Sequence, residues 1–145
     1  MHPISTEIAP FTAADIPEAL ALWRVTEGIG LFGDSPEAIA RTLERSPGLS
    51  FVARDGGAMV GCVLGTHDGR RGYLHHLAVA RSHRGRGIGR ALAERCVAAF
   101  AAAGLARCHL FVQRDNPPAV EFWRHAGWAE RTDVVMMSKT LREKG

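Results

Sequence analysis

The sequence has 145 residues, of which 46% are hydrophobic and 23% charged, and its formal net charge is +3. A chain of this length and composition can bury a core of its own, which excludes a disordered or fibrous protein. The three cysteines are an odd number without a C-x-x-C pair, which argues against a disulfide framework. The first ten residues lack the basic start and apolar core of a secretory leader, and no apolar run is long enough to span a membrane. We therefore expect one cytoplasmic domain covering residues 1–145.

The first third of the chain predicts one strand and two helices. Residues 6–9 favour a short strand, and residues 12–15 (Thr-Ala-Ala-Asp) resemble a capping box that opens a helix. Its apolar residues recur at three-and-four spacing up to Trp23, and a glycine pair at 28 and 30 ends it. A second helix is predicted to begin at Ser35-Pro36, a cap followed by proline at the first helical position, and to stop near residue 47.

The middle of the chain predicts three strands that form an antiparallel meander. Apolar, strand-like runs cover residues 49–53, 59–65 and 72–79. The turn signals Asp-Gly-Gly at 55–57 and Asp-Gly at 68–69 separate them.

The last part alternates helices and strands. An amphipathic helix is expected over residues 87–103, a strand over 106–112, a short helix over 118–126 and a final strand over 134–141. The order is therefore β-α-α-β-β-β-α-β-α-β. It predicts an α/β fold with a mixed central sheet, an antiparallel meander followed by a strand-helix-strand crossover, flanked by helices.

A glycine-rich segment, Arg84-Gly85-Arg86-Gly87-Ile88-Gly89, lies between a predicted strand and the long helix. Glycines let the backbone approach a ligand, and the free N–H groups of a helix start attract anions. The pattern favours a pyrophosphate, although a strand-to-helix turn without a ligand explains it as well. A Walker loop is excluded because Lys-Ser or Lys-Thr is missing, and the glycine spacing differs from the dinucleotide fingerprint.

Basic residues gather around this segment, which suggests a polyanionic partner: nucleic acid, a phosphorylated cofactor or an anionic surface. They are Arg70, Arg71, Arg81, His83, Arg84, Arg86 and Arg90. A solvated loop is the plain alternative. The cluster lacks interleaved aromatic residues and any nucleic-acid motif, which argues against a nucleic-acid-binding module.

Two motifs resemble the GNAT superfamily of N-acetyltransferases. Arg84-x-x-Gly87-x-Gly89 matches the family signature R/Q-x-x-G-x-G/A, and residues 116–128 follow the pattern N-x-x-A-x-x-F/L-Y-x-x-x-G-F. The strand Leu74–Val79 takes the place of the family's fourth strand, and the predicted element order matches the whole fold. The resemblance implies a GNAT-like single domain that acylates an amine with acetyl-coenzyme A. The amine is left open, because the superfamily acylates diverse substrates.

The resemblance also implies which residues contact the cofactor. The backbone of Leu77, Ala78 and Val79 is expected to pair with the pantetheine arm, helped by a bulge near Leu77 that opens the sheet. Asn116 is expected near pantetheine, and Phe122 and Trp123 near the thiol. The pyrophosphate is expected on the residues Arg84, Gly85, Arg86, Gly87, Ile88, Gly89 and Arg90.

The catalytic groups are less defined. An amine attacks a thioester only when neutral, so a base must take its proton. Candidates are Tyr73, His75 and His76, with Tyr73 and His75 on one strand face and His76 on the other. The glutamate that family members often carry near these positions is missing. Trp123 replaces the family's tyrosine, whose phenol is often assigned as the acid that protonates the leaving thiolate. Either water or another residue protonates it here, or no acid is needed, and we favour the last alternative. The indole is then a wall of the cofactor tunnel.

Three hypotheses follow, ranked in this order: an N-acetyltransferase with direct transfer in a ternary complex, a non-catalytic acyl-coenzyme-A-binding regulator, and a nucleic-acid-binding module. The expected partner is a small-molecule or peptide amine, without a membrane, and a homodimer is compatible with the fold. The spacing of His67, His109 and His125 fits no metal site, so we expect no metal.

Overall fold

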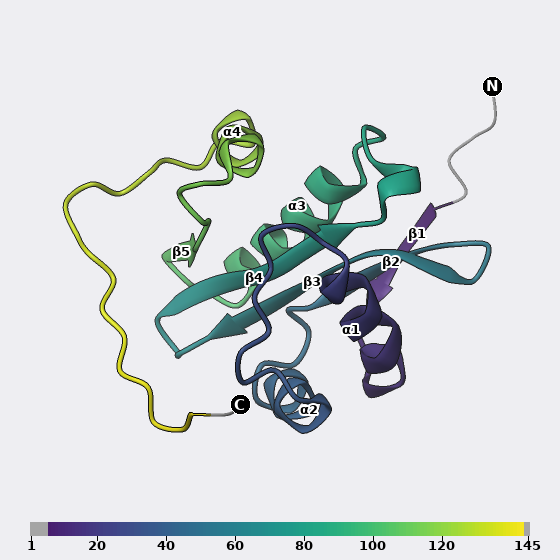
Figure 1. Cartoon of the computed structure of the whole chain (residues 1–145), viewed down its shortest axis with the longest axis horizontal. Helices are drawn as coiled ribbons and strands as arrows, with labels where there is room; N and C mark the ends of the chain where they lie inside the picture. The colour runs from purple at the N-terminus through teal and green to yellow at the C-terminus, as the bar shows by residue number, and fades with distance from the viewer. Residues whose placement is uncertain (1–5, 144–145) are drawn as a thin grey trace.

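The computed structural model describes residues 6–143, so the part of the leader expectation that concerns residues 1–5 lies outside it. Its centre is one five-stranded sheet in the order β1-β2-β3-β4-β5 (Figure 1). The first four strands pair antiparallel, and β5 pairs parallel with β4 after a helical crossover. Their bounds are β1 Thr6–Pro10, β2 Phe51–Asp55, β3 Ala58–His67, β4 Arg71–Val79 and β5 Arg107–Leu110.

Four α-helices cover the two faces of the sheet: α1 (Ile16–Arg24), α2 (Pro36–Arg45), α3 (Ile88–Ala102) and α4 (Pro117–His125). Figure 1 shows α1 and α2 on the near side and α3 on the far side. Trp23 of α1 lies in one apolar cluster with Cys62 and Ala78, and Phe100 of α3 lies in the other with Val63 and Leu74. Short 3₁₀ turns, η1 (Ala13–Asp15) and η2 (Arg81–His83), precede α1 and α3. No helix within residues 6–143 is long and apolar enough to cross a membrane.

The capping signals read from the sequence are confirmed. Thr12 donates its backbone N–H to the Asp15 carboxylate over 2.8 Å, and Ser35 Oγ accepts from the Ala38 N–H over 3.1 Å. Each cap satisfies a helix-start group that has no partner inside the helix. The predicted mixed sheet, meander and crossover are also confirmed, with boundaries that differ by a few residues.

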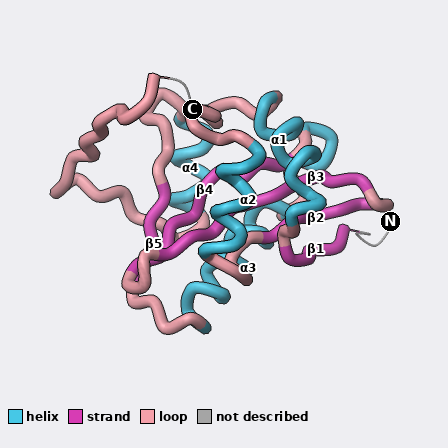
Figure 2. Tube along the Cα trace, turned by 90° about the horizontal axis from the view of Figure 1, so that it is seen from below, coloured by secondary structure: helices cyan, strands magenta, loops and turns pink. Residues whose placement is uncertain are grey.

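The predicted final strand at 134–141 is wrong. Residues 129–143, here called the arm, form neither helix nor strand in the described chain and are exposed throughout. They run away from the sheet in Figure 1, and Figure 2 shows a loop trace that projects beyond β5. The arm contains the consecutive apolar residues Val134-Val135-Met136-Met137. Apolar and polar residues do not alternate in this run, so the run does not indicate whether one face of a strand is buried.

The packing of β3 against the segment before β2 generates a stability prediction. A Cβ at Gly65 would overlap the Leu49 backbone carbonyl, whereas a Cβ at Gly30 would meet nothing within 4 Å. We expect Gly65→Ala to lower the free energy of unfolding by about 3 kcal/mol, because a backbone group cannot move aside as a flexible side chain can. Gly30→Ala, the control, should change it by less than about 1 kcal/mol. Urea unfolding measures both, and equal effects would contradict the packing described.

Candidate active site

Strand β4 contains a bulge at His76 and Leu77. Cys62 of β3 pairs with Ala78 and Leu64 pairs with His75, so two β4 residues lie opposite the single residue Val63. His76 has φ of 54°, the one positive value among the described residues other than glycine. Two residues opposite one, with an unusual backbone conformation at the first, are the features of a β-bulge. The bulge predicted near Leu77 is therefore confirmed.

The bulge changes which side chains share a face. Residues that pair across strands point to the same side, and Leu64 belongs to the cluster under α1, so its partner His75 faces α1 and α2. The ring of His76 also lies on this side, 5.1 Å from the Trp23 ring of α1. The expectation that His75 and His76 lie on opposite faces is therefore wrong. Strict alternation holds only for an uninterrupted strand, and the extra residue resets it.

β4 and β5 stop pairing two residues before the bulge. The two strands pair from Arg71–Arg107 to Leu74–Leu110, where β5 ends, while β4 continues to Val79. A cavity of about 110 Å³ lies in the opening between the two strands and is lined from β4 by Leu74, His76 and Leu77. Of the backbone predicted to pair with an extended ligand, Leu77 lines this cavity, and Ala78 and Val79 follow it on β4.

The glycine-rich segment ends at the start of α3. Gly85 and Gly87 have φ of 79° and 84°, a left-handed conformation that glycine adopts without strain. Gly87 is the N-cap of α3, and no side chain caps the helix. The first amides of the helix, those of Ile88, Gly89 and Arg90, have no acceptor within it. They form a positive helix end beside the last residues of β4.

Acidic neighbours neutralise most of the basic cluster. Glu27 bridges two of its arginines, accepting from Arg81 over 3.0 Å and from Arg84 over 3.1 Å. Arg84 also donates its Nε to the Val79 carbonyl over 3.0 Å, which anchors the glycine-rich segment to β4. The remaining contacts are Arg70 with Asp68, His83 with Asp55 and Arg90 with Glu94. A cluster paired in this way is a weak footprint for nucleic acid.

Two residues predicted from the second motif, Asn116 and Trp123, line the far wall of the small cavity. Asn116 is the N-cap residue of α4, without a hydrogen bond from its side chain to the helix. A Cβ at Gly28 would come within 2.5 Å of its Nδ2, so the α1–α2 connection lies directly against it. Trp123 is 9% exposed and lines the same small cavity as His76. Its ring packs edge-on against Phe122 at 4.9 Å and Trp128 at 5.5 Å. Phe122 in turn approaches Gly89 at the start of α3.

The three candidates for a base have different surroundings. His76 Nε2 lies 2.7 Å from Asp34 Oδ2, and the His76 carbonyl accepts from the Trp23 indole over 2.8 Å. His75 Nε2 lies 3.3 Å from Thr66 Oγ1, and its ring stacks on that of Tyr73. Burial, followed by the neighbouring His76, holds the pKa of His75 below its ordinary value. Of the three, His76 alone lines the small cavity.

Sequence reasoning did not find two of these contacts. The sequence places Asp34 in the connection between the first two predicted helices, where the family resemblance implies selection of the amine. It places Trp23 among the apolar residues of the first helix. Contacts over 42 and 53 residues along the chain depend on the bulge, which the sequence does not place to the residue. Within residues 6–143, no group of three or more His, Cys, Asp or Glu side chains could hold a metal ion.

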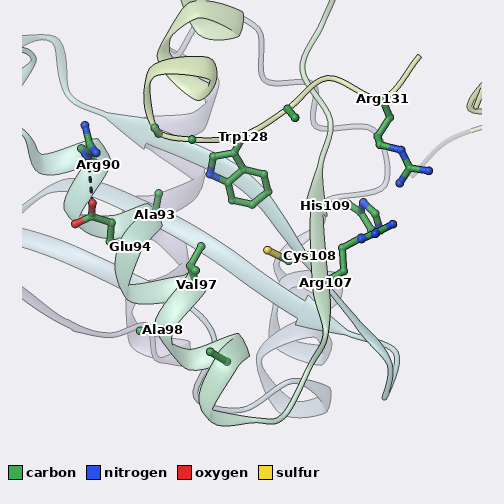
Figure 3. Close-up of a pocket in the computed structure, with 14 residues that line it drawn as sticks. Arg90, Ala93, Glu94, Val97, Ala98, Arg107, Cys108, His109, Trp128 and Arg131 are labelled. Atoms are coloured by element: carbon green, nitrogen blue, oxygen red, sulfur yellow. Dashed lines mark hydrogen bonds and ion pairs between the residues drawn. The ribbon is translucent and has the colours of Figure 1, made fainter. Parts of the chain in front are cut away.

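A second, larger cavity lies on the opposite side of β5. It has a volume of about 900 Å³ and runs between α3, β5 and the chain after α4 (Figure 3). We call it the α3–β5 groove. Ala93, Val97, Ala98, Cys108 and Trp128 form its apolar part, and charged residues such as Arg90, Glu94 and Arg131 lie around it. The groove shares no residue with the small cavity at the bulge.

Solved structures share this fold. Ard1 from Thermoplasma volcanium superposes with a TM-score of 0.78 at 20% sequence identity, covering 87% of this chain and 84% of that one. AAC(6')-Iy, solved with a bisubstrate analogue of coenzyme A and acetylneamine, superposes with a TM-score of 0.74 at 17% identity, covering 93% and 98%. At these identities the likeness concerns the fold.

Sequence comparison gives the family. A curated acetyltransferase from Sodalis glossinidius is 31% identical over 137 residues, which are 94% of this chain and 96% of that relative. The model of the acetyltransferase (GNAT) family matches residues 18–128, from α1 through the glycine-rich segment to the end of the second motif. The chain therefore belongs to the acetyltransferase (GNAT) family.

Proposed function

We propose that this single-domain acetyltransferase moves an acetyl group from acetyl-coenzyme A to a primary amine, by direct transfer in a ternary complex. The observation that carries the proposal is the opening between β4 and β5. It combines a strand edge that β5 leaves unpaired with a histidine that lines the small cavity, and the start of α3 packs against the end of that strand. Relatives named acetyltransferases favour catalysis over the alternative of a non-catalytic regulator.

The opening suits the shape of acetyl-coenzyme A. The pantetheine arm would lie along the β4 backbone at Leu77, Ala78 and Val79, in the manner of an added strand. The pyrophosphate would lie on the amides from Arg84 to Arg90, where the positive end of α3 stabilises negative charge. Asn116 would lie near the pantetheine region, and Phe122 and Trp123 of α4 near the thiol end. Asn116 and Trp123 both line the small cavity.

The acceptor would approach from the α1–α2 connection, because Glu27, Gly28 and Ile29 line the small cavity. Acetyl-coenzyme A supplies a thioester carbonyl that a neutral amine can attack. His76, which faces the cavity, would take the proton from the amine as its nitrogen bonds to the carbonyl carbon. The backbone N–H of Val79 is proposed to stabilise the oxyanion. His75 and Tyr73 are then second choices, because neither lines the cavity.

The leaving thiolate needs no acid from Trp123. An indole N–H is a poor acid, and a thiol with pKa of about 8.5 already leaves fairly well near neutral pH. A covalent cysteine intermediate is not supported either. Burial raises the pKa of Cys62 and of Cys96 to about 12, and also raises that of Cys108, so all three thiols are kept protonated. These free thiols also fit the cytoplasmic location that we propose.

We also propose a homodimer in which the arm of one copy lies in the α3–β5 groove of the other. The arm exposes large apolar side chains, with Val135 84% and Met137 88% exposed. The outer edge of β5 has no strand partner in the described part of the chain, and the apolar groove lies beside it. A strand-like segment and a free sheet edge complement each other through main-chain hydrogen bonds.

The proposed base generates a kinetic prediction. His76→Gln should lower kcat by roughly 100-fold or more, because an amide cannot accept the proton, and should leave the KM for acetyl-coenzyme A nearly unchanged. A panel of primary amines with detection of the released thiol measures both. His75→Gln is the matched control and should retain most of the activity. Equal activity of the His76 variant and wild type would show that another group is the base.

The proposed dimer generates a second prediction. Val135→Asp should raise the dissociation constant of the dimer by at least about tenfold, because a carboxylate would be buried in the apolar groove. Val25→Asp makes the same change at a site that is 72% exposed outside the arm, and should leave the dimer intact. Light scattering during size exclusion gives the mass. A wild type that stays monomeric at high concentration would contradict the proposal.

A further inference from the structure

We infer that Asp34 is a positioning residue for His76: it holds the proton on Nε2 and thereby leaves Nδ1 as the nitrogen that accepts the proton of the amine. This inference rests on the proposed function, because it concerns how its base is prepared. It starts from the 2.7 Å contact between His76 Nε2 and Asp34 Oδ2. The two residues are 42 positions apart, so the fold and not the local chain brings them together.

Hydrogen bonds hold the backbone around Asp34 in place. The next residue, Ser35, is the N-cap of α2 and accepts the Ala38 N–H, and the Asp34 N–H itself donates to the Leu31 carbonyl over 3.1 Å. The backbone on both sides of the Asp34 side chain is therefore held by hydrogen bonds. The Asp34 and His76 side chains are 24% and 21% exposed, which protects their contact from much of the competition with water.

His76 is held from the other end by its own backbone. The Trp23 side chain is fully buried, and its indole donates to the His76 carbonyl. The Trp23 ring also meets the imidazole edge-on, with an angle of 62° between the planes. Trp23 thus fixes the backbone and one side of the ring, and Asp34 fixes the ring's outer nitrogen. Together they leave the imidazole little freedom to rotate.

The carboxylate decides which nitrogen can act. An ionised carboxylate only accepts hydrogen bonds, so the contact requires an N–H on Nε2. A neutral imidazole has one N–H, so Nδ1 carries the free electron pair. When Nδ1 takes the proton of the attacking amine, the imidazolium that forms lies against the Asp34 carboxylate, which stabilises it. Charge is therefore balanced within the pair as the amine becomes an amide.

The other charged groups near Asp34 and His76 have little electrostatic effect on the contact between them. His75 precedes His76 on β4, and burial keeps its pKa below the ordinary value, so it adds little positive charge. Glu27 lines the cavity from the α1–α2 connection, but both of its oxygens accept from Arg81 and Arg84. Asp34 is thus the carboxylate that contacts the imidazole directly.

The test combines kinetics with proton NMR of the imidazole. Asp34→Ala should lower kcat roughly 10- to 100-fold with little change in the KM for acetyl-coenzyme A, because a misaligned base reduces the rate and not cofactor binding. The double variant Asp34→Ala/His76→Gln should be no slower than His76→Gln alone, because the two residues act as one unit. Glu37→Ala, which removes a carboxylate from the first turn of α2, is the control and should retain kcat.

The NMR readout does not depend on turnover. Wild type should show a downfield imidazole N–H signal, slow to exchange with water, that correlates with Nε2 of His76 and disappears in Asp34→Ala. Loss of that signal together with the loss of kcat supports the inference. A wild type without the signal, or an Asp34→Ala variant with full kcat beside an impaired His76→Gln, would overturn it. If His76→Gln itself keeps full activity, the proposed base fails, and the NMR signal still decides whether Asp34 sets the tautomer.

Discussion

The hydrogen bond from the Trp23 indole to the His76 carbonyl is the interaction on which the site depends. A left-handed conformation at a residue other than glycine costs roughly 1–2 kcal/mol, so the surrounding structure must impose it. The indole N–H of a fully buried tryptophan needs an acceptor, and leaving it without one costs about 1–3 kcal/mol. The bulge supplies that acceptor. The free-energy cost of the left-handed backbone at His76 is therefore similar to the cost of leaving the Trp23 indole without an acceptor. The hydrogen bond between the two residues avoids the second cost and offsets the first.

The consequences of the bulge extend along β4. It turns His76 toward α1 and α2, where the imidazole contacts the Asp34 carboxylate. It also shifts the pairing register between the rest of β4 and β3 by one residue. Because β5 ends at Leu110, the last residues of β4 have an edge without a partner from β5, and we propose that the ligand pairs there. Arg84 then ties the glycine-rich segment to the Val79 carbonyl, which places the start of α3 at the end of that edge. The residues of β4 therefore serve both the packing of the core and the proposed chemistry.

Much of the fold could be predicted from the sequence, because local signals were strong. The caps at Thr12 and Ser35, the turns of the meander and the apolar spacing of α3 each depend on residues near one another in the chain. The helix start after the glycine-rich segment could be predicted for the same reason. The prediction of a final strand was wrong because its apolar run has no alternation, and because strand pairing depends on a partner elsewhere in the fold.

The site was predicted only in part. The bulge near Leu77 came from the family resemblance, but the position of the extra residue, and hence the face of His76, depends on the pairing register with β3. The sequence places Asp34 in the connection before the second helix, which is correct, but its contact with His76 is not visible in any local pattern. Long-range contacts between single side chains are the part of a structure that local sequence signals cannot specify.

The most direct test of the central claim, that the glycine-rich segment and the β4 edge bind acetyl-coenzyme A, is calorimetry on three proteins. Gly87→Glu would bring a carboxylate to the helix start, while Gly69→Glu introduces the same residue at φ of 91° in the β3–β4 turn, at the opposite end of β4 from Val79. We predict that wild type and Gly69→Glu bind acetyl-coenzyme A with micromolar affinity and that Gly87→Glu binds at least about tenfold more weakly. No binding by wild type, or equal binding by all three, would contradict the claim.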